Sequence, residues 1–516
     1  MATMLHRPGL ILFLFCISFY TMIQYGGIRA PDAEVVFRVA ENLSNDKGFG
    51  VSADLENWKG FGVAYGKDSV LYSVYPPGES VALVPFIMTA RWINQSAWYE
   101  NVNVPLSHYV NDGLRKTLYG QIESNKAPHA LRFLCSFFNV LCGAIGVLLF
   151  YIILLRMTRS EFASFAVSVL YAFGTILWSY AGTFFSEPLT LVWILASFYF
   201  LIKSDRRFLE KPIRVNSTYF LLAGTMLGIA LVTHTNSVML LPFFFWYCVQ
   251  LSGKNWSGVL LFAAGILIFA FLLGGYNWMR FDSMMETGRG LSQHNPVDFA
   301  SPLSGLYWKN LFALLFGYGK GLLWFCPAVL LGIATWGTLQ KNHRTLSIFL
   351  STMILGVILM VPAYAYWHAG FCLGPRYLMM IIPFLLIPLA FWIKETMERD
   401  RIGLKLIAVA CAASLAVIQQ LYFCIGELFS YYHIMKWSYL NKGVDIFIND
   451  RIYIDWLFSP IHQLLEFFRG PFLFRSLSVS NQILWTGLSF LILLILAAAI
   501  AYLFPKTTNK KTSRLQ

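Results

Sequence analysis

Long apolar runs dominate the chain and are separated by short polar segments. A helix needs about 20 mainly apolar residues to cross a hydrocarbon core of about 30 Å. Applied along the chain, this criterion predicts an all-α integral membrane protein with about 12 transmembrane helices. The predicted helices cover residues 9–25, 133–155, 161–180, 186–203, 217–234, 236–250, 257–277, 321–339, 345–365, 375–394, 402–424 and 482–504.

The distribution of basic residues orients this bundle, because short cytoplasmic loops carry an excess of Lys and Arg. The basic clusters that fall on the same side of the bilayer as Arg7 lie within 156–159, 203–214, 341–344, 394–405 and 506–514. We therefore expect both termini in the cytoplasm. The long segments 26–132, 278–320 and 425–481 are then expected on the extracytoplasmic face.

Two stretches of the first outer segment have a helical pattern. PDAEVVFRVAENL, which begins at Pro31, repeats its apolar residues at helical spacing and predicts an amphipathic helix lying on the membrane. YSVYPPGESVALVPFIMTARWI, which begins at Tyr72, has an apolar part too short and too Pro-bounded to cross comfortably. It predicts a second surface or re-entrant helix.

The composition excludes a water-soluble fold. The mean hydropathy is +0.59 and 13% of the residues are charged, against roughly 25% in soluble domains. The net charge of +13 comes from clusters between apolar runs and not from one basic stripe, so we expect no nucleic-acid partner. Most of the eight cysteines fall inside apolar runs and none form a CxxC pair, which predicts neither a disulfide framework nor a zinc site.

Three acidic residues stand at the predicted outer boundary of the membrane. Asp32 and Glu34 begin the surface helix, and Glu187 lies in the turn between the third and fourth spans. A carboxylate at this depth can act as a general base on an acceptor, or can hold a divalent cation against a phosphate. The alternative is structural, with Asp32 capping its helix and Glu187 hydrogen-bonded in a turn before Pro188.

Three arginines are expected at headgroup depth on the same face, against the charge trend of the loops: Arg280, Arg289 and Arg376. A guanidinium group suits a phosphate because its planar fork makes two charged hydrogen bonds. The alternative is an arginine that extends toward the interface and pairs with anionic lipid or an outer acid. Arg376, held between Pro375 and Tyr377, is the strongest phosphate-binding candidate. Arg280 and Tyr377 are the further candidates for binding the phosphate.

A metal site is a weaker hypothesis. The outer segments carry five further candidate ligands at loose spacing: His108, Asp112, His294, Asp298 and His368. A single loop histidine is usually solvated. We assign no cofactor, and a divalent cation near the acids is an open alternative.

Taken together, these motifs resemble the GT-C superfamily of polytopic glycosyltransferases. The similar branch is that of the dolichyl-phosphate-mannose protein mannosyltransferases and lipid A aminoarabinose transferases, grouped as family 39-like enzymes. The resemblance rests on PDAEVVFRVAENL, YPPGESVALVP, SEPLTLVWILASFYFL, YNWMRFDSMMETG and GPRYLMMIIPFLL, in this order. It implies a GT-C-like catalytic module over residues 1–424, followed by an outer loop at 425–481 and a last span with a basic tail at 482–516.

The resemblance also implies a function. The expected activity is transfer of a hexose or pentose from a polyprenyl-phosphate donor to an extracytoplasmic glycan, glycolipid or protein, at a cell membrane whose lipids hold the donor. Asp32 would be the catalytic or metal-linked acid, with Glu34 beside it and Glu187 as the second acid. Arg376, with Arg280 and Tyr377, would bind the donor phosphate.

Several positions depart from the pattern of the similar sequences. Glycine often stands at the position of Asp282, tyrosine at that of Arg289, and a Gly-Gly pair at those of His368 and Ala369. Asp32 is followed by Ala33, whereas protein mannosyltransferases carry an Asp-Glu pair, so protein mannosylation is not inferred. Two other classes stay open: a transporter or flippase of a lipid-linked sugar, and a non-catalytic membrane scaffold.

Overall fold

The computed structural model describes residues 7–463, apart from 25, 29, 52–61, 102–125, 209–216, 254, 292–304, 365, 400–402, 427–430, 433–434, 436–437 and 445–449. The predicted last span at 482–504 and the basic tail lie outside the described residues. Within the described part the chain is almost entirely helical, with one small antiparallel sheet of β1 (Val63–Tyr65) and β2 (Leu71–Ser73). This confirms the predicted all-α class.

Each predicted span within the described residues coincides with one helix or with consecutive helices. Six helical stretches of the described residues are long and apolar enough to cross a bilayer, and three shorter helices are also apolar. The long helices are α6 (Phe137–Thr158), α9 (Glu187–Ser204), α12 (Trp256–Phe281), α17 (Arg344–Met360), α18 (Ile382–Glu398) and α19 (Leu404–Ile425). The shorter ones are α1 (Arg7–Ile23), α7 (Glu161–Phe173) and α10 (Ser217–Thr233).

Three of the predicted spans are divided into shorter helical elements. Span 161–180 divides into α7 and α8 (Leu177–Ala181), because the Thr175 hydroxyl bonds to the Tyr171 carbonyl (2.6 Å) and accepts from the Leu177 amide (3.3 Å). Span 321–339 divides into α14 (Leu322–Phe325), α15 (Ala328–Ala334) and α16 (Trp336–Asn342), and Pro327 has no amide to donate. Span 236–250 begins as η4 (Thr235–Leu240), a 3-10 helix, before α11 (Leu241–Ser252).

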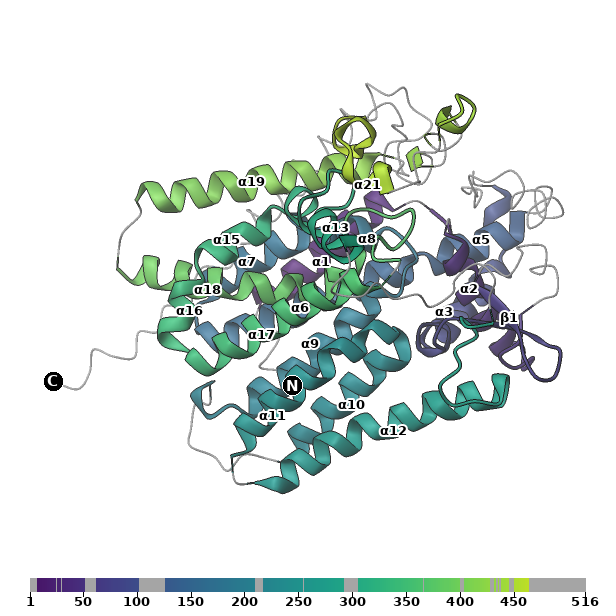
Figure 1. Cartoon of the computed structure of the whole chain (residues 1–516), viewed down its shortest axis with the longest axis horizontal. Coiled ribbons are helices and arrows are strands. Elements are labelled where there is room, and N and C mark those ends of the chain that lie inside the picture. Colours follow the sequence, from purple (N-terminus) through teal and green to yellow (C-terminus); the bar gives the residue numbers. More distant parts are fainter. Residues whose placement is uncertain are drawn as a thin grey trace.

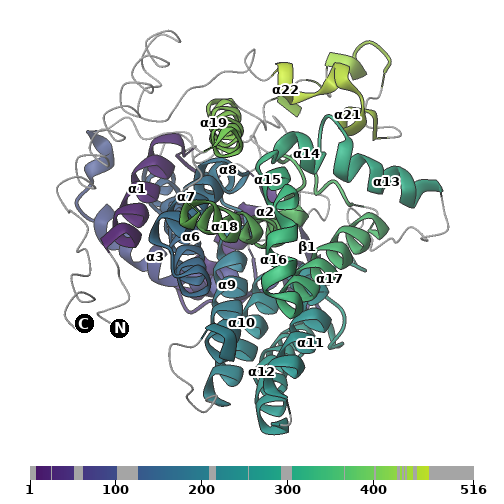
Figure 2. The ribbon, with the colours of Figure 1, turned by 90° about the vertical axis from the view of Figure 1, so that its left-hand side faces the viewer.

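The long helices run roughly along one direction, and the elements of the first outer segment gather at one end of them (Figure 1). These elements are β1 and β2 with α2 (Pro31–Leu43), α3 (Gly78–Asn94), η2 (Trp98–Glu100) and α5 (Lys126–Cys135). Seen along the bundle, α10, α11 and α12 lie on one side and α19 lies on the opposite side (Figure 2). Further described elements are η3 (Arg206–Phe208), α13 (Gly305–Phe316), η5 (Val361–Ala363), η6 (Arg376–Ile381), α21 (Arg451–Ile454), η8 (Trp456–Phe458) and α22 (Pro460–Gln463).

Glycines allow α10 and α12 to pack in backbone contact. A Cβ atom added to Gly224 would lie 2.0 Å from the carbonyl oxygen of Phe262, and one added to Gly265 would lie 2.5 Å from the amide nitrogen of Thr225. Small residues at such crossings let membrane helices approach closely, so that van der Waals packing holds them together. The two helices therefore depend on glycine at both positions.

Replacing Gly224 with alanine is expected to lower the free energy of unfolding by roughly 1–3 kcal/mol, because the added methyl group forces the helices apart. Thermal unfolding of the purified protein in lipid nanodiscs measures the effect. Gly275→Ala, on the same helix α12, is the matched control, since a Cβ added there meets no atom of a neighbouring described element within 4 Å. Equal unfolding temperatures for the two variants would contradict the tight crossing.

The helix predicted at Pro31 forms, as α2, but it is more deeply enclosed than a surface helix. Every residue from Ala33 to Ala40 is buried, including Glu34 and Arg38. The amphipathic pattern suggested a solvated polar face because the sequence does not show that Arg132, 98 residues further along the chain, reaches Glu34. The α3 helix also forms, with Pro85 inside it, and its Ser80 hydroxyl donates to the Val36 carbonyl of α2 (2.9 Å).

Candidate functional site

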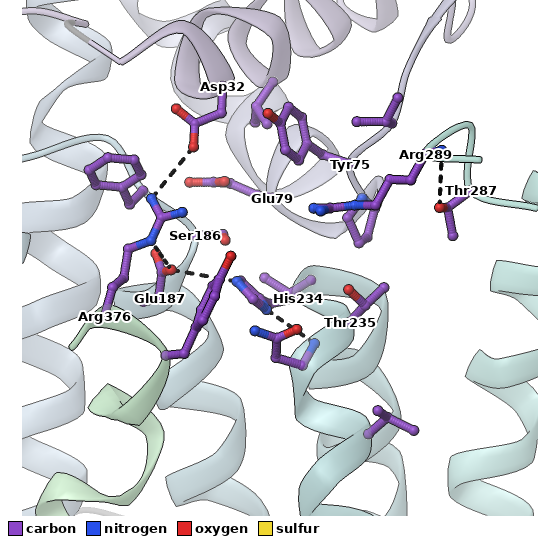
Figure 3. A pocket seen from close by; sticks show the side chains of 18 of the residues that line it. Asp32, Tyr75, Glu79, Ser186, Glu187, His234, Thr235, Thr287, Arg289 and Arg376 are labelled. Atoms are coloured by element: carbon purple, nitrogen blue, oxygen red, sulfur yellow. Dashed lines mark hydrogen bonds and ion pairs between the residues drawn. The ribbon is translucent and has the colours of Figure 1, made fainter. Parts of the chain in front are cut away.

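A cavity of about 400 Å³ lies where the outer elements meet the helical bundle. Its walls come from seven separate parts of the chain: the start of α2, residues 74–79, the turn before α9, residues 233–239, the loop after α12, and the segments around residues 361 and 376. Asp32, Glu187, Arg376 and Tyr377, four of the predicted site residues, line it together. Figure 3 shows the charged side chains turned toward this space.

Arg376 lies between two carboxylates. Its Nε atom is 3.0 Å from Glu187 Oε1 and its Nη1 atom is 3.5 Å from Asp32 Oδ2 (Figure 3). The Phe185 ring covers the guanidinium group at 4.3 Å. The three charged side chains are 11%, 9% and 23% exposed for Arg376, Glu187 and Asp32, so their attraction is only weakly screened by water.

The local sequence explains how these three residues reach one place. Asp32 and Glu187 stand in the first turns of α2 and α9, next to Pro31 and Pro188, where proline suits a helix start. Arg376 begins η6 after Gly374, whose φ of +55° favours glycine. A Cβ at Gly374 would also lie 2.7 Å from Phe325 Cβ, so the turn that presents Arg376 requires glycine.

The segment that leads to Arg376 is fixed from below by a buried amino group. Lys320 is fully buried, and its Nζ donates to the carbonyl oxygens of Gly370 (2.8 Å) and Cys372 (2.5 Å). The Tyr180 hydroxyl donates to the next carbonyl, that of Leu373 (2.8 Å). These bonds hold three carbonyl groups of the segment, so the protein's own contacts fix the position of Arg376.

His234 extends the charged group on the far side of Glu187. Its Nε2 atom lies 3.5 Å from Glu187 Oε1, and its Nδ1 atom accepts from the Asn236 amide (3.2 Å). Because Nδ1 is an acceptor, the proton of the neutral ring must be on Nε2, facing Glu187. Nothing in the sequence singled out this histidine, whose contact with Glu187 depends on the end of α10 lying beside the start of α9.

Glu79 is a third acid in the cavity wall that the sequence analysis did not single out. It lies in the first turn of α3, is 2% exposed, and its Oε1 atom has no hydrogen-bond partner. Burial, together with the nearby charges of Glu187 and Asp32, raises the pKa of Glu79 well above its ordinary value. The available signal was an acid inside the apolar motif YPPGESVALVP, where an unpaired charge is costly.

Arg289 enters the cavity from the side opposite Arg376 (Figure 3). Its Nη1 donates to the Tyr364 hydroxyl (3.0 Å), and its guanidinium group lies 5.8 Å from the centre of the Tyr75 ring. Tyr75 and Tyr364 also line the cavity. The structure therefore places two of the three outer arginines in one site.

Two predicted site residues do not line this cavity. Glu34 is fully buried behind α2, where its carboxylate accepts from Arg38 Nε (2.9 Å) and from Arg132 Nε (3.0 Å) and Nη2 (2.5 Å). Arg280 is buried below the outer hairpin and donates to Ser73 O, Tyr276 O (3.2 Å) and Asn277 Oδ1 (2.8 Å). Both side chains are held by protein partners outside the cavity.

Replacing Glu34 with glutamine is expected to destabilise the protein by about 3–5 kcal/mol, because Arg132 and Arg38 then lose their buried counter-charge. Thermal unfolding in nanodiscs measures the change. Glu41→Gln on the same helix is the control, since Glu41 pairs with Arg91 at 3.7 Å with both side chains about one third exposed, and such pairs contribute roughly 1 kcal/mol or less. If both variants unfold at the same temperature, the Glu34 cluster is not a major support.

The described residues contain no group of three or more His, Cys, Asp or Glu side chains placed to hold a metal ion. His108, Asp112, His294 and Asp298 lie outside the described residues. His368 is described, and its Nδ1 accepts from the Gly370 amide (3.0 Å) while its ring stacks on Tyr453 at 4.4 Å. The ring also lies beside those of Tyr366 and Trp367, so it is surrounded by protein groups.

Three comparisons with known proteins complete this description. The family model of dolichyl-phosphate-mannose-protein mannosyltransferases matches residues 109–285, which include Glu187 and His234. No curated protein sequence matches the chain significantly.

Solved structures of two membrane proteins are similar to this one. ArnT from Cupriavidus metallidurans matches at 10% identity and a TM-score of 0.44 when bound to undecaprenyl phosphate, over 85% of this chain and 73% of ArnT. The apo state of ArnT matches at 12% identity and a TM-score of 0.42, over 76% of this chain and 58% of ArnT. The second protein is the archaeal oligosaccharyltransferase AglB from Archaeoglobus fulgidus, in complex with an inhibitory peptide and a dolichol-phosphate. It matches at 11% identity and a TM-score of 0.45, over 82% of this chain and 56% of AglB.

The family match agrees with the resemblance indicated by the motifs and with the membrane-spanning helical fold. Residues 109–285 therefore resemble the dolichyl-phosphate-mannose-protein mannosyltransferases, in a chain with six helical stretches, among the described residues, that are long and apolar enough to cross a membrane.

Proposed function

We propose that this protein transfers a sugar from a polyprenyl-phosphate donor to an acceptor on the extracytoplasmic face of a cell membrane. The observation that carries the proposal is the convergence of Asp32, Glu187 and Arg376 in one cavity at the end of the bundle. These residues come from an outer helix and from the starts of two different apolar helices. The site therefore joins a base and a phosphate ligand at the depth of the lipid headgroups.

The surroundings of the cavity suit a donor with a long apolar tail. Three apolar residues that line it are strongly exposed: Val238 (51%), Met285 (91%) and Met360 (41%). Exposed apolar groups beside a charged cavity allow a polyprenyl chain to leave toward lipid while its phosphate stays with the polar residues. A soluble nucleotide-sugar donor would not need this rim.

The proposed reaction is a direct displacement at the anomeric carbon. The acceptor oxygen forms a bond to C1 of the sugar, its proton passes to the Asp32 carboxylate, and the bond between C1 and the phosphate oxygen breaks. The leaving polyprenyl phosphate takes the bonding electron pair and gains a negative charge, which Arg376 stabilises. Inversion of the anomeric centre follows from this geometry.

The other predicted site residues receive supporting roles. Glu187, held by His234, orients the guanidinium group of Arg376, and Tyr377 lies beside it in the cavity wall. Glu34 fixes the helix that carries Asp32, and Arg280 fixes the hairpin strand that leads to Tyr75 and Glu79.

The proposal also includes the orientation of the protein in the membrane. The positive-inside rule puts both termini in the cytoplasm and the cavity on the outer face. All cavity residues lie between Asp32 and Tyr377, which supports a catalytic module within residues 1–424. The acceptor is then a glycan, glycolipid or protein outside the cytoplasm.

The test is sugar transfer by the purified protein in lipid nanodiscs, with radiolabelled polyprenyl-phosphate hexoses and pentoses as donors and a membrane lipid extract as acceptor. We expect label in the acceptor fraction and an equal amount of released polyprenyl phosphate. Donor binding without turnover, together with movement of donor across the bilayer in proteoliposomes, would instead establish a transporter or flippase.

A further inference from the structure

The positive charge of Arg289 has no acidic partner in the part of the chain that the structure describes. Arg376, in contrast, is paired with both Asp32 and Glu187. The contacts of the Arg289 guanidinium group are neutral ones, the Tyr364 hydroxyl and the Tyr75 ring. A partly buried cation without a counter-charge is unfavourable unless a ligand supplies one.

The turn that carries Arg289 is built to hold it in place. Glu286 Oε1 accepts from the amides of Gly288 (2.7 Å) and Gly290 (3.2 Å), on either side of Arg289. Gly288 has a φ of +87°, and a Cβ there would lie 2.7 Å from the Phe281 ring. Asn277 Nδ2 anchors the same loop through the Met284 carbonyl (3.1 Å). The guanidinium group is therefore presented to the cavity by an ordered turn.

The remaining acid in the cavity does not neutralise Arg289. Glu79 lies between the two arginines in Figure 3, but it makes no ion pair within the described residues. Its burial favours the protonated, uncharged form. The cavity thus has acidic partners around Arg376 on one side and a cation without an acidic partner among the described residues, Arg289, on the other.

We propose that Arg289 binds a second anionic group of the substrate, a carboxylate or phosphate on the transferred sugar or on the acceptor, separate from the donor phosphate at Arg376. This inference rests on the proposed function and specifies its substrate class as an acidic one. The guanidinium fork pairs with either anion through charged hydrogen bonds. The two arginines enter the cavity from opposite sides, which gives each anion its own place.

Binding to the purified protein in nanodiscs tests this without requiring turnover. The donor probes are polyprenyl phosphate, a polyprenyl-phosphate hexose and the corresponding hexuronic acid. The acceptor probes are an uncharged glycolipid and the same glycolipid bearing a phosphate. We expect the wild type to prefer one acidic probe over its neutral match by about tenfold or more, as charged hydrogen bonds allow, and the arm that shows the preference identifies its source.

Arg289→Gln should abolish that preference and leave the affinity for polyprenyl phosphate unchanged, while Arg289→Lys should keep part of it. Tyr364→Phe removes the hydrogen bond from Arg289 but keeps the guanidinium group, so it should keep the preference for the acidic probe. If Arg289 acted only by holding Tyr364 in place, Tyr364→Phe would have the same effect as Arg289→Gln. Arg91→Gln is the control for charge, because Arg91 lies outside the cavity and pairs with Glu41.

Three results would overturn the inference. They are no preference of the wild type for an acidic probe, an equal loss of affinity for neutral and acidic probes in Arg289→Gln, or weaker binding of polyprenyl phosphate itself by Arg289→Gln. Failure of the proposed function looks different. An Arg289-dependent preference without any sugar transfer would keep the anion site and reject the transferase. Sugar transfer in which acidic and neutral substrates react at equal rates, in wild type and in Arg289→Gln alike, would keep the transferase and reject the anion site.

Discussion

Asp32→Asn is expected to lower the rate of sugar transfer by about 10²- to 10⁴-fold, the usual contribution of a positioned general base, with donor affinity retained. Asparagine has nearly the same shape and can still accept a hydrogen bond from Arg376, but it cannot take up the acceptor's proton. Single-turnover transfer and donor binding in nanodiscs separate these two effects.

The control for this variant is Asp46→Asn, a change of the same kind at an exposed residue beyond the end of α2. It should leave transfer at the wild-type rate. Transfer by Asp32→Asn at the wild-type rate would remove Asp32 from the chemical step, and the base would have to be sought among Glu79 and Glu187.

The pH profile of the wild type gives the same residue a second signature. Burial raises the pKa of Asp32 above its ordinary value, although the charge of Arg376 opposes the shift. A base acts only when deprotonated, so transfer should fall as the pH drops through this raised pKa. In Asp32→Asn, the fall in transfer rate at low pH that is due to protonation of Asp32 should disappear.

Arg376→Lys is expected to lower kcat/KM for transfer by about 10²–10³-fold, the cost of removing one preorganised donor to a developing negative charge. Lysine retains the positive charge between Asp32 and Glu187, which protects the fold. It cannot reproduce the planar fork that contacts both carboxylates and a phosphate at once. Transfer kinetics and equilibrium binding of polyprenyl phosphate measure the loss.

Arg91→Lys provides the matched control, because it makes the same change outside the cavity. It should transfer sugar at the wild-type rate. If Arg376→Lys retained both normal binding of polyprenyl phosphate and normal transfer, Arg376 would be a structural partner of Asp32 and Glu187, and the phosphate site would lie elsewhere in the cavity.

The sequence was least informative about which polar residues share a site. Asp32 and Glu34 were expected to act together, but they are two positions apart on α2. Since each residue of a helix turns by about 100°, side chains two apart point to nearly opposite faces. Asp32 therefore faces Arg376, and Glu34 faces Arg132.

Arg280 and Arg289 show the same limit. Arg280 stands in the last turn of α12 and Arg289 in the loop that follows, and both matched the description of an arginine at headgroup depth. Arg280 is still helical, so its side chain reaches back to the Tyr276 carbonyl one turn earlier and to Ser73 of the hairpin. Arg289 lies beyond the helix on a turn that faces the cavity.

The sequence by itself determined the membrane character, the helical class and the approximate position of each described span. These follow from the number and spacing of apolar residues, which depend only on neighbours along the chain. It also named Asp32, Glu187 and Arg376, because an unexplained charge beside an apolar run is costly. Only the tertiary structure brought in Glu79 and His234, placed Arg289 opposite Arg376, and separated Glu34 and Arg280 from the cavity, because those outcomes depend on contacts between segments far apart in sequence.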